Sequence, residues 1–249
     1  YPSAQADKLK KKRSVDVKIF DKDGKLYYDR KARMNYRGSS SLNFVKKSYA
    51  FCPGDEMCGD VEKGLDYVIT KKVNMFNLGA EDKDWVLYAA AADPSMMRNR
   101  IVFDTYYKMT NKWSVKSMYV ELVVDGEYKG VYVFMDKITK NKNRVNITAA
   151  DGFIVKFDKT DIADRYVDGK QEDSDEKTFM TVETGKQGID TYGTQVDQLF
   201  EIEYPEKDDN KGTWNNIVAS IKDKFETFET ALAEGNYSKV REIIDYDSW

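Results

Sequence analysis

The sequence contains no histidine, and this absence removes several kinds of active site. Without an imidazole the chain cannot form a Ser-His-Asp triad, a Cys-His dyad or a His-ligated zinc centre. Any chemistry must therefore run on carboxylates, on Lys, Arg, Ser, Thr or Tyr side chains, or on a bound metal ion.

Only two cysteines are present, Cys52 and Cys58, and they flank the short stretch Pro-Gly-Asp-Glu-Met. Two thiols without histidine partners cannot complete a conventional zinc site. A tight Pro-Gly turn would bring them within reach of a disulfide, and two free thiols remain the alternative. A catalytic thiol is disfavoured, because nothing beside either cysteine would lower its pKa.

Long apolar runs are also missing. The longest, Trp85 to Ala92, is far shorter than the roughly 20 residues that cross a bilayer, so we expect no membrane span. Lys plus Arg total 40 against 43 acids, a net charge of -3, which gives no reason to expect nucleic acid as a partner. The 249 residues, 41% of them apolar, suffice for one large domain or two small ones.

Alternating apolar and polar residues predict a strand-rich first half after a flexible leader at residues 1–14. The clearest signal is the Asp125-Gly126 turn between two β-rich runs, which is typical of a hairpin. The other expected strands lie near residues 15–19, 25–27, 32–36, 48–51, 65–69, 152–157, 179–183 and 199–204. The fold class that follows is α+β, with an antiparallel strand-rich N-terminal lobe.

Helices are expected in two places. The Ala-rich stretch Trp85 to Ala92 predicts one helix, and Asp93-Pro94 predicts the start of a second that runs to about Lys108. Later, apolar residues recur at helical spacing from Trp214 to Leu232, with Gly235 as the C-terminal cap, and a shorter helix follows. Between these regions, the acidic stretch Asp161 to Glu176 predicts an exposed loop.

One candidate anion site is the segment Arg37-Gly38-Ser39-Ser40-Ser41, followed by Lys46-Lys47-Ser48-Tyr49. Backbone N–H groups in a turn of small residues can point at a phosphate, and a nearby lysine can supply the charge. An ordinary solvated hairpin has the same composition, so this pattern alone does not decide between the two. Strand alternation would place Lys47 with Tyr49 on the inner face and Lys46 on the outer face.

Two further segments complete the set of motifs. In Asp93-Pro-Ser-Met-Met-Arg98-Asn99, Asp93 is either a helix cap beside a surface Arg98 or part of a site. In the hairpin from Tyr119 to Ile138, Gly130 indicates a bulge or a close backbone approach, and Asp136 ends the second strand.

Taken in this order, the three segments resemble the CotH (spore coat protein H) kinase family. The likeness rests on Arg37-Gly-Ser-Ser-Ser41 with Lys46-Lys47-Ser-Tyr49, on Trp85-Val-Leu87 with Asp93 to Asn99, and on Asp125-Gly-Glu-Tyr128 with Gly130-Val-Tyr132. It extends to Tyr204-Pro-Glu206 and to residues 243–248. The resemblance implies an atypical protein-kinase-like fold, with a nucleotide-clamping lobe at 15–138 and a second part of the same domain at 139–249.

The resemblance also implies roles for particular residues. Arg37 and Gly38, Ser39, Ser40 and Ser41 would lie near the phosphates of ATP, together with Arg98. Lys47 would contact phosphate, preferred to Lys46 because the family pattern tolerates change more readily at the first position of the pair. A carboxylate, either Asp93 or Asp104, would orient that lysine. Met135 and Asp136 would form the hinge beside adenine.

The activity implied is ATP-dependent phosphorylation of protein Ser or Thr residues with Mg²⁺ or Mn²⁺, by a protein exported to the cell surface or spore coat. The family's metal-binding and catalytic acids are not recognisable in this chain, and we expect them beyond Trp249. The 249 residues alone would then bind nucleotide poorly and transfer no phosphate. The alternative is a non-catalytic, pseudokinase-like surface or coat-assembly module.

Overall fold

The structure is a computed structural model that describes residues 12–38, 40–60, 65–159, 198–207 and 209–245, and the pairs 166–167, 170–171, 178–179, 188–189 and 195–196. Two compact units divide the chain, Tyr1–Asn146 and Ile147–Trp249. The described part combines antiparallel sheets with α-helices, so the expected α+β class is confirmed.

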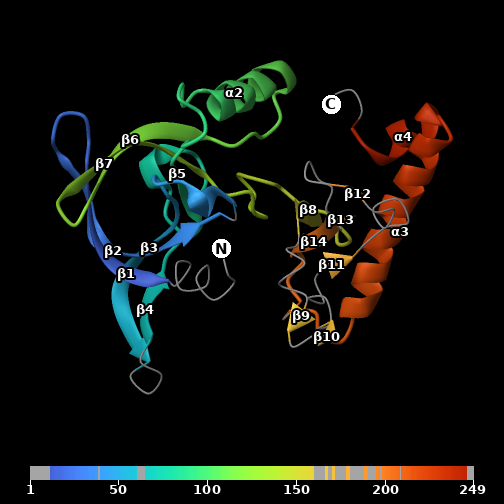
Figure 1. The fold of residues 1–249 in the computed structure, drawn as a ribbon, viewed down its shortest axis with the longest axis horizontal. Helices are drawn as coiled ribbons and strands as arrows, with labels where there is room; N and C mark the ends of the chain where they lie inside the picture. The colour runs from blue at the N-terminus through green and yellow to red at the C-terminus, as the bar shows by residue number, and fades with distance from the viewer. Residues whose placement is uncertain are drawn as a thin grey trace. The chain divides into compact units, whose positions relative to one another are not determined.

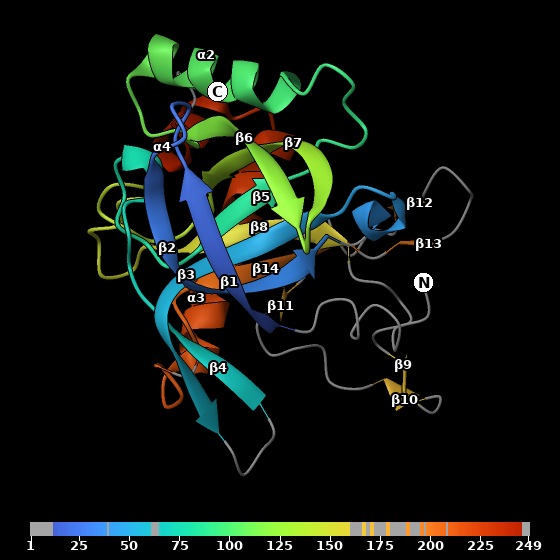
Figure 2. The ribbon, with the colours of Figure 1, turned by 90° about the vertical axis from the view of Figure 1, so that its left-hand side faces the viewer.

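The first unit is built on one antiparallel sheet of seven strands in the order β1-β2-β3-β5-β7-β6, with β4 paired to β3. The sheet curls around its inner face (Figures 1 and 2). Its strands are β1 (Arg13–Phe20), β2 (Leu26–Arg37), β3 (Ser48–Asp60), β4 (Leu65–Thr70), β5 (Trp85–Tyr88), β6 (Ser117–Val124) and β7 (Glu127–Asp136).

The core of the first unit lies on this inner face. Val15, Val17 and Ile19 all turn toward it from β1, because every second side chain of a strand shares a face. Trp85 and Phe134 come from the central strands and stack with their ring centroids 5.3 Å apart. Burying each such side chain contributes about 1.5–3 kcal/mol to folding.

The Asp125-Gly126 hairpin is confirmed. It joins β6 to β7, with Val124 opposite Glu127. Both turn residues have positive φ, 51° for Asp125 and 79° for Gly126, as a two-residue turn that matches the twist of the strands requires. Gly130 has a φ of 87°, and the pairing register shifts opposite it, between Leu122 and Val123, so the expected bulge is also present.

The prediction of a helix at Trp85 to Ala92 is wrong. Trp85–Tyr88 is the strand β5, and its first three residues are buried. A central strand that is buried on both faces reads as a continuous apolar run, and periodicity cannot separate such a run from a buried helix.

The next helix begins later than expected. Helix α2 is Arg98–Thr110, whereas the sequence indicated a start at Pro94. Met96 has a φ of 55°, in the left-handed region, so residues 93–96 form a turn and not the first turn of a helix. Helix α2 lies beside β6 in both views, and the Arg100 guanidinium sits 4.8 Å from the centre of the Tyr119 ring (Figures 1 and 2).

The turn expected between the two cysteines is absent as well. Cys52 and Cys58 both lie in β3, where six extended residues span about 20 Å. A disulfide needs α-carbons within about 7 Å, so this strand keeps the two residues apart. Cys52 is a free, buried thiol, and burial raises its pKa.

The described part of the second unit contains a three-stranded sheet, two two-stranded pairs and two helices. β14 (Gln198–Tyr204) pairs with β8 (Ile154–Lys159) and with β11 (Thr178–Phe179). The two-stranded pairs are β9 (Tyr166–Val167) with β10 (Lys170–Gln171), and β12 (Gly188–Ile189) with β13 (Gln195–Val196). Apart from β9 and β10, the loop expected at Asp161 to Glu176 lies outside the described residues.

The amphipathic helix is confirmed as α3 (Trp214–Ala233), followed by α4 (Tyr237–Ile243). Gly235 ends α3 with a φ of 67°, the left-handed conformation of a C-terminal cap. Trp214 and Ile221 are buried against β14, and Phe225 packs on Phe200 with ring centroids 4.5 Å apart. No described helix is both long and apolar enough to span a bilayer.

Replacing Phe225 with Ala should lower the free energy of unfolding of the second unit by about 3 kcal/mol, because the half-buried ring contacts both Phe200 and Phe153. Denaturant unfolding followed by hydrogen exchange of the β8 and β14 amides measures this. Leu232→Ala is the control, since Leu232 is 49% exposed on the same helix, and it should cost less than about 1 kcal/mol. Equal effects of the two variants would show that Phe225 is not a core residue.

Candidate functional site

The three segments singled out in the sequence, residues 37–49, 85–99 and 119–136, contact one another in the first unit. We call them the motif segments. The Lys46 ammonium donates a hydrogen bond to the Val131 carbonyl and so joins the first segment to the third. The Ala89 N–H donates to Ser48 Oγ at 3.0 Å and joins the second segment to the first.

A third contact closes the set. The Tyr119 hydroxyl donates to the Met96 carbonyl at 3.2 Å, which ties the hairpin to the turn before α2. Residues more than 80 positions apart therefore share one end of the curled sheet, where β3 begins and β5 ends. The order of the three segments in the sequence could not show that they meet in space.

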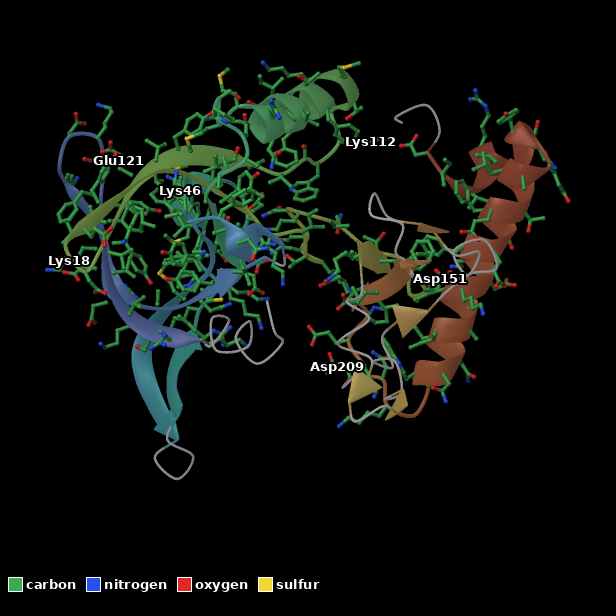
Figure 3. All side chains as sticks on the ribbon, in the orientation of Figure 1. Lys18, Lys46, Lys112, Glu121, Asp151 and Asp209 are labelled. Atoms are coloured by element: carbon green, nitrogen blue, oxygen red, sulfur yellow. The ribbon has the colours of Figure 1, made fainter. Side chains whose placement is uncertain are left out.

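Lys46 is the central cation of this arrangement (Figure 3). Its ammonium lies 4.6 Å from the centre of the Tyr132 ring, in addition to its bond with Val131. Burial lowers the pKa of Lys46. No carboxylate within the described residues forms an ion pair with it.

The tyrosines around Lys46 cannot supply the missing countercharge. Tyr36, Tyr49 and Tyr132 form a row with ring centroids 5.1 Å and 6.0 Å apart. Burial raises the pKa of both Tyr49 and Tyr132, so these phenols stay neutral at physiological pH. Lys46 is therefore a partly buried positive charge whose partners among the described residues are one backbone carbonyl and one aromatic face.

The expected outward direction of Lys46 is wrong, because its ammonium lies over the ring of the buried Tyr132. The Lys47 ammonium donates to the carbonyls of Leu42, at 2.7 Å, and Phe44, beside the turn that follows Gly38. Strand pairing begins only at Ser48, so alternation does not extend back to Lys46 and Lys47. Lys47 instead caps the short 3-10 turn Ser40–Asn43, where unpaired carbonyls attract a cation.

Gly38 makes the turn before Ser41 tight. Its φ is 119°, and a Cβ atom added there would lie 1.9 Å from Ser41 Oγ. Arg37 ends β2 and is exposed. Ser39 and the Ser40 side chain lie outside what the structure describes, so the expected row of serines is placed only in part.

Gly38→Ala should destabilise this turn by about 1–3 kcal/mol, because alanine adds both a strained φ and a steric clash. The double variant Gly38→Ala with Ser41→Ala removes the clash but keeps the strain, and it should recover only part of the loss. Hydrogen exchange of the amides at residues 40–44 measures the local opening. Full recovery in the double variant would show that the backbone conformation of Gly38 carries no cost.

Asp93 caps the start of α2, which was one of the two interpretations of this residue in the sequence. Its carboxylate accepts hydrogen bonds from Ser95 Oγ at 2.6 Å and from the Arg98 N–H, the first residue of α2, at 3.0 Å. The hydrogen bond from Ser95 is the main reason that the pKa of Asp93 is lowered. Arg98 Nε lies 3.5 Å from the same carboxylate, but the Arg98 side chain is 76% exposed and its guanidinium reaches solvent.

Neither acid proposed to orient a lysine does so in this structure. Asp93 accepts hydrogen bonds within the turn before α2. Asp104 lies 3.9 Å from Arg100, one turn earlier in α2. Asp136, which we expected beside adenine, is also held by another residue. Its side chain is fully buried, with Oδ1 3.1 Å from Arg144 Nε. Burial raises the pKa of Asp136, and the Arg144 charge opposes that shift.

Arg144 is the residue that sequence reasoning missed. Its guanidinium is fully buried, lies 4.6 Å from the centre of the Trp85 ring and pairs with Asp82 Oδ2 at 3.2 Å as well as with Asp136. It also donates to the carbonyls of Asp84, at 2.8 Å, and Lys137, at 3.1 Å. This network fastens residues 137–144 to the end of β7, so the Asp136 side chain has a structural role.

No group of three or more acids, histidines or cysteines that could hold a metal ion occurs among the described residues. We therefore assign none of the described residues as a ligand of the Mg²⁺ or Mn²⁺ that the resemblance implies.

The fold and the site together define an α+β protein in which a curled sheet gathers a glycine-containing turn and an uncompensated lysine at one end. A family model described as CotH kinase protein matches residues 34–249, from near the end of β2 to the last residue, and includes all three motif segments. The chain therefore belongs to the CotH kinase protein family. A search of curated proteins found no match.

Proposed function

We propose that this protein is a CotH-type protein kinase that transfers phosphate from ATP to Ser or Thr residues of a protein, and that its first unit contributes the clamp for the ATP phosphates. One observation carries the proposal: Lys46 is partly buried where the motif segments meet, and it forms no ion pair with a described carboxylate. An anionic ligand would supply the charge that the surroundings lack.

Phosphoryl transfer depends on aligning the triphosphate and neutralising its charge. Lys46 would exchange its bond to the Val131 carbonyl for a phosphate oxygen, which accepts a stronger, charge-assisted hydrogen bond. This assigns to Lys46 the role that the resemblance had suggested for Lys47, whose ammonium already bonds two carbonyls.

The remaining residues of the proposed clamp play lesser parts. Backbone N–H groups in a turn of small residues, such as the one that contains Gly38, can point at a phosphate, and Arg98 extends an exposed guanidinium from the start of α2. A divalent cation would neutralise further charge when bound, but we assign it no ligand in the described residues. Export to the cell surface and a Ser-bearing protein substrate belong to the same proposal and are supported by family membership alone.

Binding of a fluorescent ATP analogue tests the proposal, with Lys46→Met and the matched variant Lys47→Met. We expect weak binding by the wild-type chain, a loss of about tenfold or more in Lys46→Met, and nearly wild-type affinity in Lys47→Met. Competition by unlabelled ATP must abolish the signal. Equal affinities for wild type and Lys46→Met would contradict the proposed clamp.

A further inference from the structure

Tyr132 lies against the Lys46 ammonium and is itself held in place. The centre of its ring is 4.6 Å from Lys46 Nζ, within the distance at which an aromatic face attracts a cation. Tyr132 is 1% exposed, so its ring is enclosed by the core of the first unit. The ring of Tyr49 packs beside it, with centroids 6.0 Å apart. The aromatic face next to the ammonium is therefore a fixed part of the fold.

The backbone of β7 leaves room for a lysine at this point. Pairing between β5 and β7 ends where Tyr88 lies opposite Val133. Earlier in β7, the Val131 carbonyl accepts its hydrogen bond from the Lys46 ammonium. A Cβ atom on Gly130 would lie 3.9 Å from Lys46 Nζ, so a larger residue there would fill the space around the ammonium. The ammonium thus sits at the edge of β7, in contact with a carbonyl and an aromatic face.

We propose that Tyr132 is a positioning residue, which holds the Lys46 ammonium where it meets a phosphate oxygen without first having to be ordered. An ammonium has three N–H donors. Lys46 can therefore exchange its bond to the Val131 carbonyl for a phosphate oxygen while it keeps its contact with the ring. Without the ring, the long lysine side chain would lose its rotamer freedom only on binding, at an entropic cost to affinity. This role rests on the proposed phosphate clamp.

The position of the ammonium can be measured without a nucleotide. Reductive methylation with isotope-labelled formaldehyde adds NMR-visible methyl groups to the lysines and preserves their positive charge. The ring current of Tyr132 should shift the methyl signal of Lys46 upfield of the signals of solvated lysines, and Lys46→Met identifies that signal by removing it. Tyr132→Phe should keep the shift, and Tyr132→Leu should abolish it. An unshifted Lys46 signal in the wild-type chain would overturn the proposal, whether or not ATP binds.

The effect on affinity is measured with the fluorescent ATP analogue. Tyr132→Leu should weaken binding by about five- to tenfold, whereas Tyr132→Phe should bind like the wild type, because the attraction comes from the aromatic face and not from the hydroxyl. The matched control is Phe51→Leu, since Phe51 is 3% exposed in the same core and packs against Phe134. This control should lose stability, as Tyr132→Leu does, and keep both its affinity and the shifted Lys46 signal.

The two measurements separate this role from the proposed function. If the wild-type chain shows the shifted signal but binds no ATP analogue, the phosphate clamp is wrong, and the role of Tyr132 in it is overturned as well. If the wild type binds and Tyr132→Leu binds equally well, only the role of Tyr132 is overturned. An equal loss of affinity in Phe51→Leu would also overturn it, because the loss would then follow from a weakened core.

Discussion

Arg144→Met should lower the free energy of unfolding of the first unit by about 3–5 kcal/mol. The guanidinium is fully buried between Asp82 and Asp136, and removing it leaves two buried carboxylates without their cation. Breaking one partner of such a network costs far more than losing a surface ion pair, because an uncompensated charge stays in a low-dielectric environment. Denaturant unfolding, read by hydrogen exchange of the β5 and β7 amides, gives the difference.

Two variants make this result specific. Arg98→Met removes an arginine that is 76% exposed, and it should cost less than about 1 kcal/mol. Adding Asp136→Asn to Arg144→Met removes one of the stranded charges and should restore part of the lost stability. If the double variant were as unstable as the sum of the two single variants, the Asp136–Arg144 pair would not be the source of the effect.

The second large effect is on phosphate transfer. Under the proposed kinase function, Lys46→Met should lower the transfer rate from radiolabelled ATP to Ser-containing peptides by about 10²–10³-fold, the loss typical of removing one preorganised charge from a phosphate or oxyanion. Lys47→Met should lower it far less, since Lys47 bonds backbone carbonyls.

Stability separates this effect from misfolding. Lys46→Met exchanges a partly buried ammonium that has no described carboxylate partner for an apolar side chain of similar length, so the fold should lose little. A wild-type melting temperature together with lost transfer would support the proposed role. An equally large loss in Lys47→Met, with its fold intact, would return the assignment to Lys47.

Local signals in the sequence were sufficient for the elements that local chemistry controls. The Asp125-Gly126 hairpin needs positive φ at two adjacent positions, and the residues there are among the few that accept it. Helix α3 was predictable because its apolar stripe has a helical period, whereas β5 was not, because burial on both faces erases the period of a strand.

The candidate site was predictable only at the level of segments. Three motifs in a fixed order identified the family. Whether Lys46 or Lys47 contacts the other motif segments depends on where β3 begins, and the 3-10 turn at Ser40–Asn43 sets that point. Arg144 was missed because its partners lie 62 and 8 residues away, at Asp82 and Asp136, and no local pattern marks a buried ion network. Contacts of this kind exist only after the sheet has formed.

The most direct test of the nucleotide-clamp assignment is covalent labelling with an acyl-phosphate derivative of ATP, which transfers its acyl group to a lysine amine beside the bound phosphates. Because burial lowers the pKa of Lys46, more of its amine is neutral and nucleophilic near pH 8 than for a solvated lysine. We predict that peptide mapping finds Lys46 acylated, that excess ATP suppresses the label, and that Lys47 stays unmodified. ATP-protected labelling of Lys47, or labelling of Lys46 that ATP does not reduce, would contradict the assignment.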